Sequence, residues 1–417
     1  MAGLARVTAL VALGLAVAGC GGGGSSPQAS AAAQPASPQT LAVQLDGRAD
    51  AFHGAFTGYF PNTLSVHPGD TVTFRLPHFS GEPHTVTVGT LVDAAAAKLK
   101  ALGPQATVAA QENSAEMLDM VDVFPHSIQG PPDANQSAAQ PCYLDTGVPP
   151  LSLKGGAPAC PKRAEPEFTG TQAFHSSGVL MDDGASYSLP LSKSIRPGTY
   201  NVICLVHRSA MTAQIQVVDS GQAVQSQADL TTRGQQQLKR LVDALTPIAA
   251  TAQGATAETA LSGAGDPSIT HPVIADPAAV NAVIVDFGPK TISIPVGGAV
   301  TWRNFYFHNI AFGAADSDVG VLQKAADGSI HLSPKAGAPA GFTVPPQAGI
   351  NIPPPDNTAP VVVDLGSWDG TGFKNTGIVQ SLPPQNVVSL KLTFSRAGTF
   401  SYRCLIHPDM KGDVKVG

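Results

Sequence analysis

The chain has 417 residues, of which 13% are charged and 6% aromatic, and its formal net charge is -6. This balance gives no reason to expect a nucleic-acid partner, and the low charge with 43 glycines and 36 prolines disfavours a coiled coil or helical bundle. Hydrophobic residues at 43% suffice for packed cores, so we expect a loop-rich all-β protein of two domains, or of three.

The N-terminus carries an apolar run at residues 7–16, which has the length of a signal-peptide core and is too short to span a bilayer. It ends in the sequence VAGC at residues 17–20, which resembles a bacterial lipobox. The resemblance implies that a signal peptide, residues 1–19, is removed and that Cys20 receives lipid. A flexible tether at residues 20–40 would follow. We therefore expect an extracytoplasmic lipoprotein of the cell membrane, on the cell surface or the periplasmic side, with an ordinary secreted protein as the alternative.

One pattern of sequence blocks occurs twice in the mature chain, in the same order. Each copy has two strands joined by a glycine-containing turn, a His before a strand, a short Phe-x-x-x-Gly block, and a strand that runs into Cys-x-x-His. The matched pairs are 60–74 with 287–302, 83–89 with 307–313, 174–179 with 373–378, and 197–207 with 397–407. The repeat predicts a tandem duplication of one β domain.

The copies differ in their insertions, which sets the predicted domain boundaries. Domain 1 is expected at residues 41–219 with a long insert at 90–173 that begins with a short helix, and domain 2 at residues 271–417. The linker at 220–270 contains apolar residues at the spacing of one helical face between 225 and 249. We expect a helix there, packed on a domain.

Each copy holds four residues whose side chains are suited to binding a metal. An upstream His precedes a strand of β-branched residues, and a later strand runs into Cys, His and Met. The residues are His84, Cys204, His207 and Met211 in the first copy, and His308, Cys404, His407 and Met410 in the second. Two imidazoles, one thiolate and a weak thioether form the ligand set of a type 1, or blue, copper site. Such ligands hold both Cu(I) and Cu(II) with little change of geometry, which suits rapid one-electron exchange. The sequence therefore predicts two type 1 copper sites.

Both copies resemble the cupredoxins, the family of plastocyanin, azurin and amicyanin. The second copy is closest to amicyanin in its Cys-x-x-His-x-x-Met spacing, with Pro408 after the ligand His, and in Asn309 after His308. The resemblance implies two tandem Greek-key β-sandwich domains with loop and helix inserts and a short helical linker. It also implies that Thr85 and Asn309, which follow the first His of each copy, tie the ligand loop to that strand around the thiolate. Thr85 departs from the Asn usual in the family. In the family, the loop His of the site reaches the surface, so His207 and His407 are expected to be the ports for electrons.

The remaining cysteines also have expected roles. Cys142 and Cys160 both lie in the insert of domain 1, and in an exported protein we expect them to pair as a disulfide.

These features predict a two-copper electron-transfer protein that is not an enzyme. Its partners would be redox proteins and the membrane that holds its lipid anchor, with no nucleic acid and no small-molecule substrate. The first alternative is a copper storage or delivery protein, for which Met117, Met120 and His126 are candidate ligands. A multicopper oxidase or a copper nitrite reductase needs further His ligands, commonly His-x-His pairs, and none occurs among the 11 histidines.

Overall fold

The computed structural model describes most of the chain. The described residues are 37–103, 106, 110–111, 114–119, 123–124, 133–140, 166–266, 281–326, 328–345, 359–381 and 387–417. The predicted signal peptide, Cys20, most of the tether and the Cys142–Cys160 pair lie outside these residues.

Strands dominate the described chain, so the predicted all-β class is confirmed. The largest sheet has nine strands. In spatial order they are β19 (Val361–Trp368), β22 (Val388–Phe394), β13 (Ala299–Asn304), β10 (Ala260–Gly265), β11 (Asn281–Gly288), β2 (Gly54–Phe60), β1 (Thr40–Ala49), β4 (Thr71–Arg75) and β7 (Ser186–Pro190).

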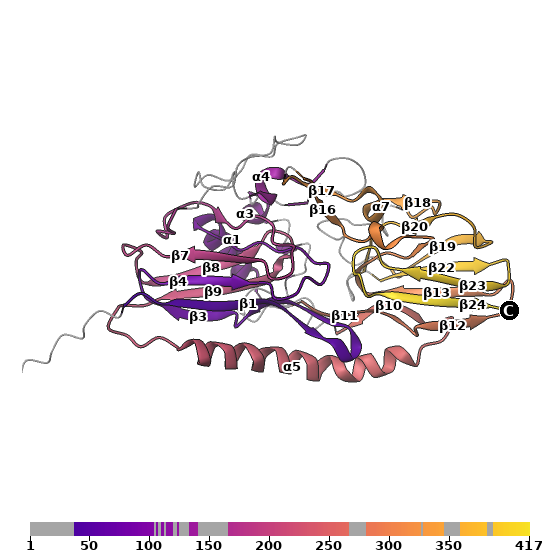
Figure 1. Ribbon diagram of the computed structural model, residues 1–417, viewed down its shortest axis with the longest axis horizontal. Helices are drawn as coiled ribbons and strands as arrows, with labels where there is room; N and C mark the ends of the chain where they lie inside the picture. The colour runs from indigo at the N-terminus through magenta and orange to yellow at the C-terminus, as the bar shows by residue number, and fades with distance from the viewer. Residues whose placement is uncertain are drawn as a thin grey trace, which may run out of the picture. The chain divides into compact units, whose positions relative to one another are not determined.

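Two smaller sheets face the two ends of this large sheet (Figure 1). The five-stranded sheet has the order β3 (Thr63–Val66), β9 (Arg208–Val217), β8 (Gly198–Cys204), β5 (Thr87–Val88) and β6 (His175–Ser176). The six-stranded sheet has the order β12 (Thr291–Ile294), β24 (Lys411–Val416), β23 (Gly398–Arg403), β15 (Ala311–Phe312), β20 (Lys374–Thr376) and β18 (Pro339–Ala340). Two further strand pairs join β14 (Tyr306–His308) to β21 (Val379–Ser381) and β16 (Leu322–Lys324) to β17 (Ile330–Leu332).

Alternating side chains explain why these sheets pack as two sandwiches. In β22, every second residue of the sequence VSLKLTF is buried, which gives the strand one face toward a core. The core of the first sandwich contains Val72 and Phe74 from the large sheet and Ile215 from the five-stranded sheet. The core of the second contains Trp302 and Tyr402, whose rings meet edge to face.

The strand connections of the two sandwiches correspond. The first strand pairs in parallel with the fourth (β1 with β4, and β10 with β13), and the third pairs in parallel with the last (β3 with β9, and β12 with β24). The two halves are joined where β2 pairs antiparallel with β11, from Thr57 opposite Asn281 to Gly54 opposite Ile284. One continuous sheet therefore runs through both halves.

Strand β10 lies inside the segment that the sequence pattern assigns to the linker, residues 220–270. Its sequence ALSGAG has small residues and no clear alternation, so local pattern gives no strand signal. Its neighbours β11 and β13 supply its backbone hydrogen bonds. The second half thus begins before residue 271.

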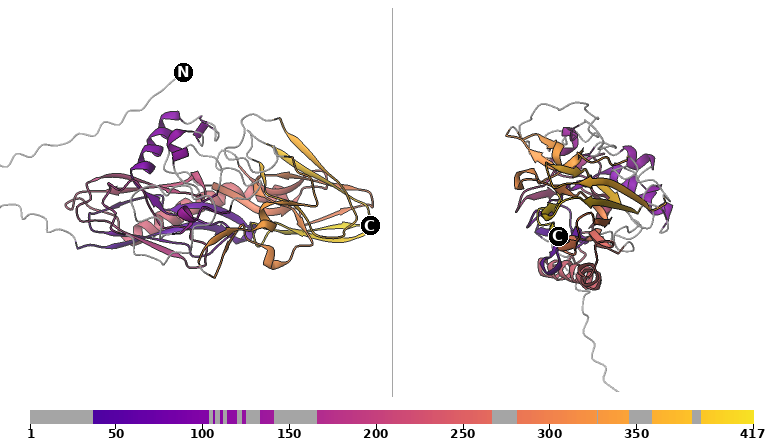
Figure 2. Two further views of the ribbon diagram at one scale, coloured as in Figure 1. Left: turned by 90° about the horizontal axis from the view of Figure 1, so that it is seen from above. Right: turned by 90° about the vertical axis from the view of Figure 1, so that its right-hand side faces the viewer.

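The predicted linker helix is present as α5 (Gln227–Gln253), which begins with a capping box formed by Ser226 and Asp229. Figures 1 and 2 show α5 lying along one side of the strands. Its apolar face includes Leu245, which packs with Phe56 of β2 and Ile284 of β11. The helix therefore covers the junction between the two halves of the sheet.

The other described helices are short. The helix expected at the start of the insert is α1 (Thr90–Leu102). Shorter ones are α3 (Ala115–Asp119), α4 (Gln136–Ala139) and α7 (Pro334–Gly337), together with the 3-10 turns η1 (Asp50–Phe52) and η3 (Asp316–Asp318). In the described part of the chain, we find no helix with the length and apolar character that a membrane crossing requires.

Candidate metal centres

The first centre forms where β8 ends. Cys204 is the last residue of that strand, His207 lies in the following turn, and His84 lies just before β5 in the same sheet. The ligand atoms of these three side chains lie within 4.8 Å of one another. Cys204 Sγ is 3.5 Å from His207 Nδ1, and it accepts backbone N–H bonds from Thr85 (3.3 Å) and Val206 (3.4 Å). Met211, in β9, is fully buried.

The second centre repeats this arrangement after β23. Its ligand atoms, from His308, Cys404 and His407, also lie within 4.8 Å of one another. The two Nδ1 atoms of the imidazoles are 3.1 Å apart, and Cys404 Sγ is 3.7 Å from His407 Nδ1. Met410 is fully buried, and its backbone bonds to both Cys404 (3.0 Å) and His407 (3.2 Å). Among the described residues, these two centres are the places where three or more His, Cys, Asp or Glu side chains lie close enough together to hold a metal ion.

The residue after the first His holds the Cys loop in both centres. Leu205 N–H donates to Thr85 Oγ1 at 2.7 Å, and Leu405 N–H donates to Asn309 Oδ1 at 2.6 Å. Thr85 therefore makes, with a hydroxyl, the same loop contact that Asn309 makes with its amide. Asn309 also donates from Nδ2 to the carbonyl of Ala336 at 2.9 Å, which fixes its orientation.

The loop imidazoles do not reach the surface as the family resemblance implies. The side chain of His207 is 7% exposed and that of His407 is 1% exposed. The turns that carry them face each other across the junction of the two halves. Each imidazole edge that was expected at the surface is therefore buried.

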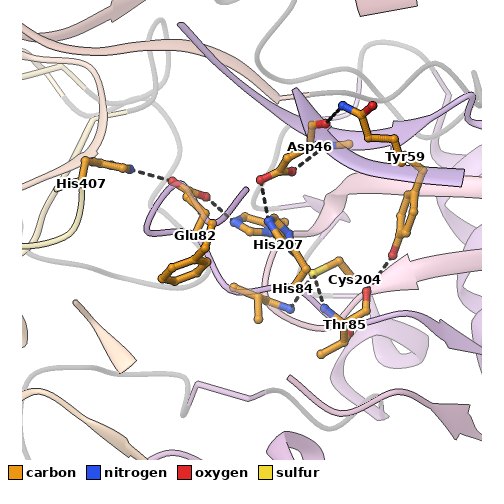
Figure 3. A network of polar contacts seen from close by, with 12 residues as sticks. Asp46, Tyr59, Glu82, His84, Thr85, Cys204, His207 and His407 are labelled. Atoms are coloured by element: carbon orange, nitrogen blue, oxygen red, sulfur yellow. Dashed lines mark hydrogen bonds and ion pairs between the residues drawn. The ribbon is translucent and has the colours of Figure 1, made fainter. Parts of the chain in front are cut away.

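Both loop imidazoles contact one buried carboxylate, that of Glu82 (Figure 3). Its Oε2 is 2.5 Å from His207 Nε2, and its Oε1 is 2.9 Å from His407 Nε2. Because an ionised carboxylate only accepts, each Nε2 carries the proton and donates it. In each ring, Nδ1 is on the side of the sulfur of its own centre.

The upstream imidazoles differ between the centres. Asp46 Oδ2 lies 2.6 Å from His84 Nε2. Nε2 of His308 is buried and has no hydrogen-bond partner among the described residues. It faces Gly263, where an added Cβ would lie 2.2 Å away. Asp46 (φ 56°) and Gly263 (φ 77°) hold equivalent places, each at the irregularity in the first strand pair of its half.

These contacts shift the pKa values of the site residues. Burial alone would raise the pKa of the Cys204 thiol, but His207 and His84 outweigh it and lower that pKa to about 5. Burial likewise opposes ionisation of Glu82, yet His207 and His407 hold its pKa well below the usual range.

The two upstream imidazoles have opposite pKa shifts. Burial would lower the pKa of His84, but the Asp46 carboxylate raises it to about 9. With no such carboxylate on its Nε2, His308 keeps a pKa lowered by burial.

Of the other predicted copper candidates, only Met117 lies among the described residues. Met117 is fully buried in the core, and its carbonyl accepts a hydrogen bond from Arg208 at 2.6 Å. Met120 and His126 lie outside the described residues.

Sequence reasoning missed Glu82, Asp46 and Gly263. Glu82 occurs two residues before His84, where the second copy has Tyr306, so comparison of the copies gives no matching acid. Asp46 and Gly263 lie in strands that precede the matched blocks. One signal was available: an acidic residue two positions before a His ligand, in a chain with only 30 acidic residues.

No protein-family model matches the chain, and no curated protein matches it. Among solved structures, it is similar to a dithionite-reduced auracyanin from the photosynthetic bacterium Roseiflexus castenholzii, at 17% identity over 43% of this chain and 96% of that one, with a TM-score of 0.20. A purple cupredoxin from Nitrosopumilus maritimus matches at 17% identity over 38% and 99% of the two chains, with a TM-score of 0.15. A pseudoazurin from Sinorhizobium matches at 14% identity over 46% and 91%, with a TM-score of 0.17. The ligand geometry of the chain itself therefore carries the functional conclusion.

Proposed function

We propose that the protein is a copper-binding electron carrier with one type 1 copper site in each half. The observation that carries this proposal is the paired ligand geometry: in each half, one buried Cys and two imidazoles have their ligand atoms within 4.8 Å of one another. A His₂Cys set with a nearby Met is the donor set that selects such a copper centre.

The residues present fit a copper ion. Cys204 and Cys404 are free and buried, and the buried Nδ1 of His84 has no hydrogen-bond partner among the described residues. In the second half, the facing Nδ1 atoms of His308 and His407, 3.1 Å apart, favour a shared cation. A zinc site of this kind usually lacks a Met ligand. Met211 and Met410 therefore favour copper.

When bound, copper supplies a one-electron exchange between Cu(I) and Cu(II). The chain's own residues make that exchange easy. The N–H groups of Thr85 and Val206 fix the Cys204 sulfur and neutralise part of its charge, while Asp46 and Glu82 fix the two imidazoles. Because these groups are buried in a packed sandwich, they would hold the ligands in one arrangement in both oxidation states of a bound copper.

The direct test is the visible spectrum of copper-loaded protein. We expect about two coppers per chain and an intense thiolate-to-copper band. Metal analysis and absorption spectroscopy measure both. Copper loading without such a band would contradict a type 1 site, and a high turnover of oxygen or nitrite per copper would contradict a carrier.

We further propose that the carrier is anchored to the cell membrane through Cys20 and exchanges electrons with redox proteins there. The support is the lipobox-like sequence at residues 17–20 and the polar, glycine-rich segment after it. A single acyl chain holds a protein only weakly, but two or more give stable anchoring.

Cys20→Ala is expected to abolish lipid attachment, and either to block processing of the signal peptide or to release the protein from membranes. Mass spectrometry of the mature N-terminus and membrane fractionation measure this. Ser25→Ala, in the same segment, should leave both unchanged. A mature N-terminus at another residue, without lipid, would contradict the anchor.

A further inference from the structure

The two candidate centres are connected through a single side chain. Nε2 of His207 donates to one oxygen of Glu82, at 2.5 Å, and Nε2 of His407 donates to the other, at 2.9 Å. In both rings, Nδ1 faces the centre and Nε2 faces away from it. A continuous route therefore runs from one centre to the other through two imidazoles, two hydrogen bonds and one carboxylate (Figure 3).

The surroundings of this carboxylate are apolar. Glu82 is 5% exposed. It lines a cavity of about 80 Å³ together with Val206, Phe307 and Ile406. A buried charge is costly unless it is paired and hydrogen-bonded, and the two ligand imidazoles provide that pairing. The two carboxylate oxygens of Glu82 are thus held by one imidazole from each centre.

The centres differ in the charge that faces the upstream imidazole. His84 bears the Asp46 carboxylate on Nε2, at 2.6 Å, whereas His308 faces the bare backbone of Gly263. Glu82 is shared by both centres, so Asp46 is the carboxylate that distinguishes them. A negative charge bonded to a ligand stabilises the more positive, oxidised state. The first centre should therefore give up an electron more readily than the second.

We propose that Glu82 joins the two centres into one electron-transfer unit, and that Asp46 directs a single electron from the first centre to the second. This inference rests on the proposed function. In the step, Cu(I) at the first centre becomes Cu(II) and Cu(II) at the second becomes Cu(I). No bond breaks, both Nε2 protons stay in place, and no further oxidant or reductant is needed.

The test is rapid reduction of the fully oxidised, copper-loaded protein with less than one electron per chain, by pulse radiolysis. The spectra of the single centres come from Cys404→Ser and Cys204→Ser. In the wild type, we expect a phase whose rate is independent of protein concentration, and Cu(I) predominantly at the second centre afterwards.

Two matched variants separate the bridge from the charge. Glu82→Gln replaces one of the two accepting oxygens with an NH₂ donor, so one of the two Nε2–H groups loses its acceptor and the bridging negative charge is lost. We therefore expect the intramolecular phase to slow at least about tenfold, and both reduction potentials to rise. Asp46→Asn neutralises a buried carboxylate at the first centre alone. It should raise the reduction potential of the first centre. The concentration-independent kinetic phase should still be observed, but a smaller fraction of the Cu(I) should be at the second centre afterwards.

An unchanged intramolecular rate in Glu82→Gln, with both thiolate bands present, overturns the bridge. A rise of both potentials in Asp46→Asn, or of neither, overturns its assigned role. Absence of the thiolate bands in the wild type would instead contradict the proposed function.

If Glu82→Gln does not fold, nitrogen-15 NMR of the wild-type protein in the Cu(I) form tests whether both imidazoles donate to Glu82. Slowly exchanging, hydrogen-bonded Nε2–H protons are expected on both His207 and His407. Rapid exchange of either proton with solvent contradicts the bridge.

Discussion

Replacing Cys404 with serine is expected to lower the copper content from about two ions per chain to about one and to remove one of two thiolate bands. The physical reason is that the sulfur of Cys404 is both a metal ligand and the origin of the band. A serine hydroxyl stays protonated near pH 7 and is a poor ligand for Cu(I). Metal analysis and the visible spectrum measure the loss.

Independent ligand sets explain why the other centre should survive. His84, Cys204 and His207 all come from the first half, and the second half uses none of them. Cys204→Ser is the matched variant and should leave the complementary band. Loss of both bands in either variant would show that the centres depend on each other for binding.

The ligands themselves could be predicted because their signal is local and occurs twice. Cys, His and Met follow one another within a single loop, and the β strand before them alternates in a recognisable way. The sandwich follows from the same alternation, since a strand with one buried face must pack on another sheet. The helix α5 could be predicted from the spacing of its apolar residues.

The connection between the halves could not be predicted. It depends on the pairing of β2 with β11. These two strands are far apart in the chain, and neither sequence has a pattern that predicts the other strand as its neighbour. Glu82 becomes a partner of His407 only because of that pairing, across 325 positions of sequence. Cupredoxin resemblance misled here, since it places the loop imidazole at a surface that in this chain is covered by the other half.

Gly263→Ala is expected to disable the second centre. The glycine has φ 77°, a conformation that costs an L-residue about 1–2 kcal/mol. The larger effect is steric: the added Cβ would lie 2.2 Å from His308 Nε2 and 2.6 Å from the carbonyl oxygen of Phe305. The backbone oxygen cannot move away cheaply, so the imidazole must shift. We expect a loss of copper affinity of about 10–100-fold or more at this centre, measured by competition with a chelator.

Gly297→Ala is the control, because it separates backbone strain from contact with the ligand. Gly297 has φ 82°, and no heavy atom lies within 4 Å of its added Cβ. It should lose similar stability and bind two coppers as the wild type does. In the first half, the equivalent bulge position already carries a side chain, that of Asp46, so the first centre should keep its band in both variants. Wild-type affinity at the second centre of Gly263→Ala would mean that His308 is not held against this backbone, and that it is free to take another position when copper binds.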